Sequence, residues 1–375
     1  MHINCLSDEL AKGVQMVERA AATKDTVPAM KGILIEAGTE GIRLAANDLE
    51  IAIECGIVGS VLNPGRVVLE ARYLAQIVRH LPEGNVDLAL DSATNTVAIS
   101  AGKAHFTVNC LPADEFPAIA ALDLATALRV TKEDLRLGIE QTIFATGRDE
   151  SRPFMTGVLM ESTDNALNLV ATDSNRLAFT QVAYVEAKTE GQGDLNVLIP
   201  TRAMGELVRI LSVGEGEVYI AMAENQVGFV TEEAKLTSRL IQARFPNYQQ
   251  VIPTEHSVSF QVDRRLFQSA LERSALIAKK GPAIVVFRLE SGQLNLSSRE
   301  AEVGSSSEVL EVEHTGDDIT IAYQVKFLLD CLKVLRTEKV EMRLRPGIGA
   351  ATVVPVGADS YRYVLMPVRV PEVMG

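Results

Sequence analysis

The chain contains no tryptophan, and it has only 11 phenylalanines and 7 tyrosines among its 375 residues. Proteins that hold single-stranded nucleic acid stack the bases on aromatic side chains, so a surface of that kind is not indicated. Apolar residues occur in short runs, and none approaches the roughly 20 residues that a membrane helix needs. Residues 1–9 lack a basic segment followed by an apolar stretch. We therefore expect no signal peptide, no membrane partner and a cytoplasmic protein.

Residues that carry catalytic chemistry or bind metals are also scarce. The four cysteines and five histidines lie at no spacing typical of a metal site, and a disulfide framework is not expected in a chain this long. There is no Walker loop or nucleophile elbow, and the glycines at 347–352 indicate a hairpin turn. Asp173 and Arg176 are interpreted as a structural ion pair. We predict a protein without catalysis, metal or cofactor, with an enzyme of unfamiliar active site as one alternative.

An internal repeat determines the predicted architecture. Three segments, at 42–50, 167–175 and 294–302, each show a short strand, a polar turn and a second strand, and their equivalent leucines, Leu44, Leu169 and Leu296, lie 125 and 127 residues apart. A buried strand followed by a helix recurs with the same period, with helices at 71–81, 201–211 and 323–335. An earlier helix is predicted in each repeat at 7–20, 131–144 and 263–280, with Ser7 and Thr131 as N-caps of the first two.

One repeat is therefore a strand, a helix, several strands, a second helix and several strands. This order predicts an α+β domain of about 125 residues, with two helices on one face of antiparallel sheet. Proline-rich stretches at 111–117 and 245–253 close the first two repeats. The predicted domains are residues 1–121, 122–253 and 254–375.

The helices differ in charge from the rest of the chain. The chain as a whole has 49 acidic and 36 basic residues, a net charge of −13, which argues against nucleic acid coating the whole protein. The six helical windows 7–20, 71–80, 131–144, 201–212, 263–280 and 323–336 instead hold 16 Lys and Arg against 10 Asp and Glu. The basic residues either occupy ordinary solvated helix faces or form a surface for a polyanion that contacts phosphates without reading bases. The candidates for such a surface are Lys12, Arg19, Lys24, Arg72, Arg79, Lys132, Arg136, Arg148, Arg202, Arg209, Arg264, Arg265, Arg273, Lys326, Lys333 and Arg336.

Four segments carry a resemblance to a known family. They are CLPADEFP at 110–117, ATDSNRLA at 171–178, RFPNYQQVIP at 244–253 and YVLMPVRV at 363–370. In this order, and together with the threefold repeat, they resemble signatures of the bacterial sliding clamps, the beta subunits of DNA polymerase III. The resemblance implies a head-to-tail homodimeric ring around duplex DNA, bound without sequence preference. Its implied partners are the replicative polymerase, the clamp loader and other clamp-binding proteins.

The resemblance also implies two sets of interface residues. A groove between the second and third domains would bind short peptides of partner proteins through hydrophobic anchors. The matching groove positions are Met155, Thr172, Ser174, Arg176, Leu177, Pro246, Val251, Gln324, Ile348, Val364, Leu365, Met366, Pro367 and Arg369. The implied dimer interface consists of Phe106 and Val108 from one copy and Leu276 and Ile277 from the other.

Two departures from the family pattern bear on the groove. The family usually has Gly and then His or Tyr where Ser174 and Asn175 stand, and residues 371–375 extend past the usual end. We expect Ser174 and Asn175 to change the loop backbone and the rim of the groove, and the extension to contact the groove. They leave open a second alternative, a specialised clamp paralogue that acts mainly as a scaffold for protein interactions.

Overall fold

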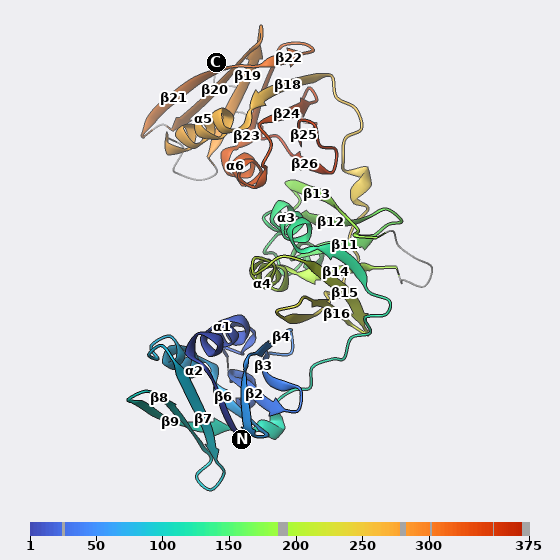
Figure 1. The fold of residues 1–375 in the computed structure, drawn as a ribbon. Helices are drawn as coiled ribbons and strands as arrows, with labels where there is room; N and C mark the ends of the chain where they lie inside the picture. Colours follow the sequence, from blue (N-terminus) through green and yellow to red (C-terminus); the bar gives the residue numbers. More distant parts are fainter. Residues whose placement is uncertain (25–26, 187–193, 278–282, 301, 348, 370–375) are drawn as a thin grey trace. The chain divides into compact units, whose positions relative to one another are not determined.

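The computed structural model describes residues 1–24, 27–186, 194–277, 283–300, 302–347 and 349–369. The same order of elements occurs three times along the chain, as predicted (Figure 1). The first repeat consists of β1 (His2–Leu6), α1 (Ser7–Val17), β2 (Gly32–Gly38), β3 (Gly41–Asn47), β4 (Ile51–Ile57), β5 (Gly59–Asn63), β6 (Gly65–Glu70), α2 (Ala71–Val78), β7 (Asn85–Asp91), β8 (Thr96–Ala101) and β9 (Ala104–Leu111).

The second repeat has one strand fewer before its second helix. It consists of β10 (Leu128–Thr131), α3 (Lys132–Ile143), β11 (Gly157–Ser162), β12 (Ala166–Thr172), β13 (Arg176–Ala183), β14 (Asn196–Pro200), α4 (Thr201–Leu211), β15 (Glu217–Ala223), β16 (Gln226–Val230) and β17 (Lys235–Arg239). The third consists of β18 (Val258–Asp263), α5 (Arg264–Ile277), β19 (Ile284–Glu290), β20 (Gln293–Glu300), β21 (Gly304–Glu311), β22 (Glu313–Thr315), β23 (Ile319–Gln324), α6 (Val325–Val334), β24 (Lys339–Leu344), β25 (Ala351–Pro355) and β26 (Tyr361–Leu365).

Contacts along the chain form two compact units. Unit 1 comprises Met1–Glu133, Tyr184–Gly193 and Arg202–Leu240, and unit 2 comprises Asp134–Ala183, Asp194–Thr201 and Ile241–Gly375. Unit 1 contains a sheet of 13 strands in the order β10-β15-β16-β17-β4-β3-β2-β6-β9-β8-β7-β1-β5. Unit 2 contains a nine-stranded sheet, β14-β11-β12-β13-β26-β25-β24-β18-β22, and a four-stranded sheet, β21-β20-β19-β23. The three-domain division at 121 and 253 remains a prediction beside these contact units.

Antiparallel strand pairing joins successive repeats. In unit 1, β4 of the first repeat pairs with β17, the last strand of the second, with Ile51 opposite Ser238. In unit 2, β13 of the second repeat pairs with β26, the last strand of the third, with Arg176 opposite Leu365. Each junction therefore uses the strand after the polar turn of one repeat and the terminal strand of the next.

The first helix of each repeat buries the same positions. These positions follow the i, i+3, i+4, i+7 spacing of a helix packed on a sheet: Leu10, Gly13, Val14 and Val17 in α1; Leu135, Gly138, Ile139 and Thr142 in α3; Phe267, Ala270, Leu271 and Ser274 in α5. Helix α1 packs beside α2 in unit 1, and α5 beside α6 in unit 2 (Figure 1). The buried stripe defines which residues of the three helices are equivalent.

One predicted cap is wrong. Ser7 was expected to cap α1 with its hydroxyl, but it is the first residue of the helix and is buried, and Leu6 occupies the N-cap without a side-chain bond. The Ser7 amide donates instead to the Gly84 carbonyl at 2.8 Å. The free amide is thus satisfied by a distant backbone group, which the local sequence does not reveal. Among the helices that the described residues form, none combines the length and apolar content required to cross a membrane.

Candidate protein-binding groove and basic helix surface

The turn between β12 and β13 carries several of the predicted groove residues. The Asp173 carboxylate accepts from the Asn175 amide at 3.0 Å and from the Arg176 amide at 3.2 Å. The Thr172 hydroxyl donates to the Arg176 carbonyl at 2.7 Å. Short polar side chains stabilise tight turns by such bonds to the local backbone. Ser174 lies at the tip with φ of 72°, in the left-handed region that favours glycine, so this turn keeps a glycine-type backbone around a serine.

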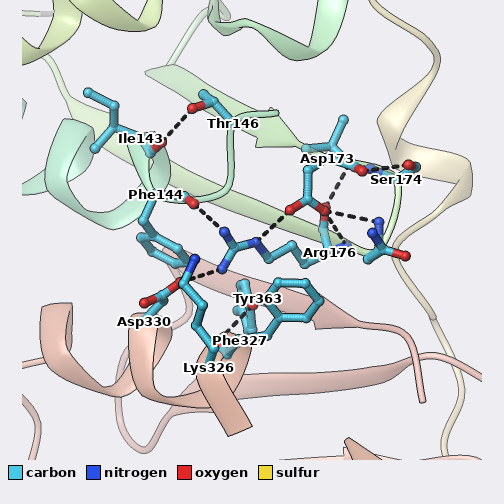
Figure 2. A network of polar contacts seen from close by, with 12 residues as sticks. Ile143, Phe144, Thr146, Asp173, Ser174, Arg176, Lys326, Phe327, Asp330 and Tyr363 are labelled. Atoms are coloured by element: carbon cyan, nitrogen blue, oxygen red, sulfur yellow. Dashed lines mark hydrogen bonds and ion pairs between the residues drawn. The ribbon is translucent and has the colours of Figure 1, made fainter. Parts of the chain in front are cut away.

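Arg176, the first residue of β13, is held by three acceptors within unit 2. Its Nε donates to Asp173 at 2.9 Å, Nη1 to Asp330 of α6 at 2.7 Å and Nη2 to the Phe144 carbonyl at 2.6 Å. Figure 2 shows the guanidinium between the carboxylates of Asp173 and Asp330. Arg176 is only 6% exposed. The predicted structural pair with Asp173 is confirmed, and the guanidinium mainly holds the turn against α6.

Aromatic rings also surround this arginine. The guanidinium carbon lies 4.4 Å from the ring centroid of Phe327 and 5.4 Å from that of Phe144. Burial by itself would lower the pKa of Arg176, but Tyr363 and the carboxylates of Asp330 and Asp173 raise it above its ordinary value. Arg176 therefore stays charged, and its neighbours replace the water that burial removes.

An apolar cluster forms the floor of the groove. Leu177 lies opposite Val364 across the β13–β26 pairing, and both are buried together with Phe179 and Tyr248, whose ring centroids are 5.8 Å apart. Partly buried side chains pack around this cluster at Phe154, Ile241, Ala243, Phe245, Ile252 and Ala350. A surface with a buried apolar floor and partly exposed apolar walls suits hydrophobic anchors of a partner peptide.

Tyr248 is a groove residue that sequence reasoning missed. It lies in the short helix Tyr248–Gln250, and its hydroxyl donates to Glu161 at 2.7 Å and accepts from Asn168 at 3.3 Å. Burial and then the Glu161 carboxylate raise the pKa of Tyr248 to about 12. The signal was present, because Tyr248 lies within the segment 244–253 that carried the resemblance.

The remaining predicted groove positions lie at several depths. Met155 and Leu365 are buried, and Met366 is 42% exposed, with its amide donating to the Asn175 carbonyl at 2.9 Å. Thus β26 leads directly to the tip of the β12–β13 turn. Pro246, Val251 and Arg369 are exposed, and Gln324 and Pro367 are partly buried. The Val251 amide donates to the Tyr248 carbonyl at 3.0 Å, which ties it to the cluster. Ile348 and the extension at 371–375 lie outside the described residues.

A cavity of about 940 Å³ lies beside Arg176, and small-molecule pockets commonly measure about 300–1000 Å³. Its lining includes Phe144, Arg148, Asp149, Arg152 and Lys326. Asp149 pairs with Arg152 at 2.8 Å. The cavity combines both signs of charge with the aromatic ring of Phe144, and it adds a polar edge to the apolar groove.

Most of the candidate basic residues are solvent-accessible. The exposed ones are Lys12, Arg19, Lys24, Arg72, Arg79, Arg148, Arg202, Arg265, Arg273, Lys326, Lys333 and Arg336. Arg136, Arg209 and Arg264 are partly buried. Accessible Lys and Arg on helices can contact phosphates without reading bases.

Lys132 does not fit the predicted basic surface. Its side chain is 2% exposed, its ammonium donates to the Val213 carbonyl at 2.8 Å, and it forms an ion pair with Glu233. Burial would raise the pKa of Glu233, but hydrogen bonds from Lys132, from the Glu233 amide and from Thr231, together with the Lys132 charge, lower it overall. Because the partner stands 101 residues away, the sequence pattern of α3 could not distinguish this buried lysine from a surface one.

Two other candidates already serve as internal donors. Arg202, at the start of α4, pairs with Asp48 and donates to the Arg19 carbonyl at 2.9 Å. Arg209 donates to the carbonyls of Gln15 and Met16 at 2.8 and 2.9 Å. Arg209 thus binds the last turn of α1, where cations are favoured by the helix dipole, and Arg202 binds the short helix Glu18–Ala20 that follows it.

The predicted dimer residues lie on or near two sheet-edge strands. Strand β9 pairs with β8 along Ala104–Asn109, and it pairs with β6 only at Cys110 and Leu111. Over Ala104–Asn109 its other side therefore has no strand partner among the described residues. Strand β21 pairs with β20 and ends the four-stranded sheet, as far as the described residues go. Phe106 on β9 and Leu276 at the end of α5 are exposed, Leu276 to 61%, while Val108 and Ile277 are partly buried. Edge strands beside exposed apolar side chains are suited to pairing with another chain.

Comparisons with known proteins agree along the whole chain. Models of the DNA polymerase III beta subunit match residues 1–120 with its N-terminal domain, 129–247 with its central domain and 249–369 with its C-terminal domain. The beta sliding clamp of Synechocystis sp. is 30% identical over 388 residues, covering 98% of this chain and 99% of that protein. The beta sliding clamp of Bacillus subtilis is 29% identical, covering 98% and 100%.

Solved structures are similar over the same length. The crystal structure of the Bacillus subtilis sliding clamp matches with a TM-score of 0.93 at 27% identity, covering 99% of this chain and 100% of that one. The Pseudomonas aeruginosa sliding clamp bound to griselimycin matches with a TM-score of 0.92 at 28% identity, with the same coverage. With three family models in sequence order on a fold of three like repeats, the chain belongs to the DNA polymerase III beta subunit family, the bacterial beta sliding clamps.

Proposed function

We propose that this chain is a DNA sliding clamp, a non-catalytic processivity factor that encircles duplex DNA. It tethers the replicative polymerase and other clamp-binding proteins through the groove around Leu177 and Val364, and the clamp loader opens it. One observation carries the proposal. An apolar cluster with partly exposed neighbours lies beside Arg176 and its acceptors Asp173, Asp330 and Phe144, on a chain that matches sliding clamps over 98% of its length.

The groove supports recruitment of partners by short peptides. Leu177 and Val364 provide an apolar floor, and the exposed Met366 provides an adaptable wall, because methionine side chains accommodate anchors of different shape. Ser174 and Asn175 are exposed at the rim, where their backbone groups can orient a bound peptide.

The strand pairing supports a head-to-tail homodimer. Within one chain, β4 pairs with the terminal strand β17, and β13 with the terminal strand β26. The equivalent strands that remain are β21 of the third repeat and β9, the terminal strand of the first. Pairing β21 of one copy with β9 of another repeats the same junction twice and closes a ring of six domains. The three clamp domains of each copy are proposed as 1–121, 122–253 and 254–375.

The basic residues support contact with duplex DNA inside such a ring. Twelve of the sixteen candidates have exposed side chains. Contacts between mobile Lys or Arg and phosphates do not depend on base sequence, so they permit sliding. Enclosure rather than tight binding then retains the protein on DNA, which is compatible with a net charge of −13. Because such DNA is the bacterial chromosome, we place the protein's activity in the cytoplasm.

Retention on circular DNA tests the proposal. The protein is loaded by a bacterial clamp loader on nicked circular DNA, separated from free protein by gel filtration, and measured again after the circle is cut. We expect co-elution with the circle and release after linearisation, together with a mass near twice 40.6 kDa. Equal retention on both forms would contradict enclosure. A protein that remains monomeric and is not retained, yet binds polymerase-derived peptides, would favour a scaffold-type paralogue.

A further inference from the structure

An arginine clasps the first junction between repeats. In unit 1, the Arg202 guanidinium bridges the Asp48 carboxylate, at the turn after β3, and the Arg19 carbonyl, just after α1. The carbonyl bond measures 2.9 Å. One side chain from the second repeat therefore joins a turn and a helix end of the first. A planar guanidinium is suited to this, because its donors point at two acceptors at once.

In the second repeat an arginine binds the equivalent two acceptors within its own repeat, and it reaches the third repeat through Asp330 of α6. In unit 2, Arg176 binds the Asp173 carboxylate at 2.9 Å and the Phe144 carbonyl at 2.6 Å. Asp173 and Phe144 each stand 125 residues after Asp48 and Arg19. The acceptors are thus equivalent in the repeat, although the donor comes from β13 here and from α4 in unit 1.

By sequence position the third repeat has two corresponding acceptors, although its acidic residue, Glu300, is the last residue of β20 and lies opposite Gly304. Asp48 and Asp173 follow the equivalent leucines Leu44 and Leu169 by four residues, and Glu300 follows Leu296 by four. The buried stripe of the first helix ends at Val17, Thr142 and Ser274, and the clasped carbonyls lie two residues later. The corresponding carbonyl in the third repeat is that of Leu276, in the last turn of α5.

The choice of donor follows a pattern of two alternatives. In unit 2 the turn is followed by Arg176, the first residue of β13, which supplies the guanidinium. The second residue of helix α6, in the next repeat, is then Lys326, whose side chain is 75% exposed. Where the strand residue is the aliphatic Ile51, the second residue of α4 is Arg202. In the third repeat the equivalent of Ile51 is the aliphatic Val303, seven residues after Leu296. By analogy with Ile51 and Arg202, we expect an arginine as the second residue of the helix that packs at this turn.

Arg72 is that arginine. It is the second residue of α2, equivalent to Arg202 in α4, and it lies in the repeat whose terminal strand is β9. Its side chain is exposed, and within the described part of the chain neither the Arg72 guanidinium nor the Glu300 carboxylate has a hydrogen-bond or ion-pair partner. The two groups have complementary charges, and both are available to another molecule.

We propose that Arg72 of one copy bridges the Glu300 carboxylate and the Leu276 carbonyl of a second copy, so that it clasps the subunit interface as Arg202 clasps the junction in unit 1. The inference rests on the proposed head-to-tail dimer. It adds a polar contact that would set the register in which β21 of one copy pairs with β9 of the other. Arg72 is then a subunit-binding residue rather than a contact to DNA.

A charge exchange tests the clasp. The dimer dissociation constant is measured by sedimentation equilibrium for the full chain, for Arg72→Glu, for Glu300→Arg and for the double variant. We expect each single reversal to weaken the dimer by about 10- to 100-fold, and the double variant to recover to within about fivefold of wild type. Lys326→Glu is the matched control at the same helix position, and we expect it to change the constant less than about twofold.

The outcomes separate the clasp from the dimer itself. Unchanged dimers in both single variants, or a double variant as weak as the sum of the two, would overturn the clasp while the wild-type dimer and its retention on circular DNA stand. A wild-type protein that stays monomeric at every concentration would overturn the dimer and the clasp together. Arg72→Lys adds a check on geometry, because a lysine keeps the charge without the fork, and we expect a loss of about threefold to tenfold.

Discussion

The junction of β4 with β17 in unit 1 and that of β13 with β26 in unit 2 share one backbone design. Both are antiparallel, and both follow a turn whose aspartate, Asp48 or Asp173, accepts from the backbone two and three residues ahead. The residue after each aspartate, Leu49 or Ser174, has φ of 72°. The repeat therefore preserves the conformation of the turn even where the side chain is unrelated.

The side chains at the two junctions differ. In unit 1, Ala52 lies opposite Thr237, whereas in unit 2 the equivalent pair is Leu177 and Val364. The cleft beside the unit 1 turn measures only about 50 Å³, since residues 118–120 line it and Lys235 donates to the Ala120 carbonyl at 2.8 Å. The small pair Ala52 and Thr237 is covered by residues 118–120, so the unit 1 junction offers little room for a ligand. The large apolar pair Leu177 and Val364 has partly exposed apolar neighbours, so the unit 2 junction can form a binding groove.

Removing the arginine from each junction should produce the largest contrast. Arg176→Ala leaves Asp173 without its cation and Asp330 with only the exposed Lys326 at 3.9 Å, and we expect the free energy of unfolding to fall by about 3–5 kcal/mol. Arg202→Ala removes a side chain that is 43% exposed, and we expect a loss below about 1 kcal/mol. Urea unfolding of both variants measures the difference. Equal losses would mean that the two clasps are energetically alike.

The buried tyrosine of the groove should make unit 2 sensitive to alkali. Because the pKa of Tyr248 is raised from 10.0 to about 12, its contribution is complete below pH 10 and is lost as the pH rises through 12. We expect that loss to be about 2–3 kcal/mol of unfolding free energy. Tyr248→Phe lacks it, so the stability difference between wild type and variant should shrink from pH 10 to 12. A constant difference in urea unfolding across this range would contradict the assignment.

Two exposed methionines offer a matched test of whether peptides bind at the groove. Met366→Ala shortens a side chain at the groove rim that is 42% exposed, and Met222→Ala does the same on β15 of unit 1, at 40%. We expect Met366→Ala to weaken binding of a fluorescent polymerase-derived peptide about threefold to tenfold, since it removes one apolar contact. Met222→Ala should leave the affinity unchanged in the same anisotropy titration. Equal effects would argue against the groove in unit 2.

The two left-handed turn residues should give the smallest effects. Glycine adopts positive φ without the strain of a β-carbon, so we expect Leu49→Gly to raise the unfolding free energy by about 0.5–1 kcal/mol. Ser174→Gly should gain less, because the Ser174 hydroxyl donates to the Asp173 carbonyl and accepts from Arg152 at 3.2 Å. Thermal unfolding of both variants compares the gains. A larger gain for Ser174→Gly would contradict a stabilising role for that hydroxyl.

Much of the fold was predictable because the repeat is written in local patterns. Helix and strand periodicities report which side of each element is buried, and they recur with a period near 125 residues. The predicted order of elements and the second helices at 71–81, 201–211 and 323–335 agree with α2, α4 and α6 within about two or three residues, the usual uncertainty of helix ends. Residues 278–280 of the predicted fifth helix lie outside the described residues.

Of the site, the sequence alone could supply candidates but not their surroundings. The segments at 171–178 and 363–370 named Leu177 and Val364, and the structure pairs them across two strands. Nothing in those segments showed that Arg176 would be enclosed by Asp330 and Phe144, or that Tyr248 would complete the apolar cluster. These partners come from other elements, and their approach depends on the packing of whole sheets and helices.

By itself, the sequence determined the threefold repeat, the α+β class and the positions of the aspartate turns, because each is a property of neighbouring residues. Only the tertiary structure decided which charges are available. Lys132 meets Glu233 across 101 residues and Arg176 meets Asp330 across 154, while Arg72 remains accessible. A charge belongs to one residue, but its desolvation and its partner depend on distant segments, so that long-range packing separates structural cations from those free to bind another molecule.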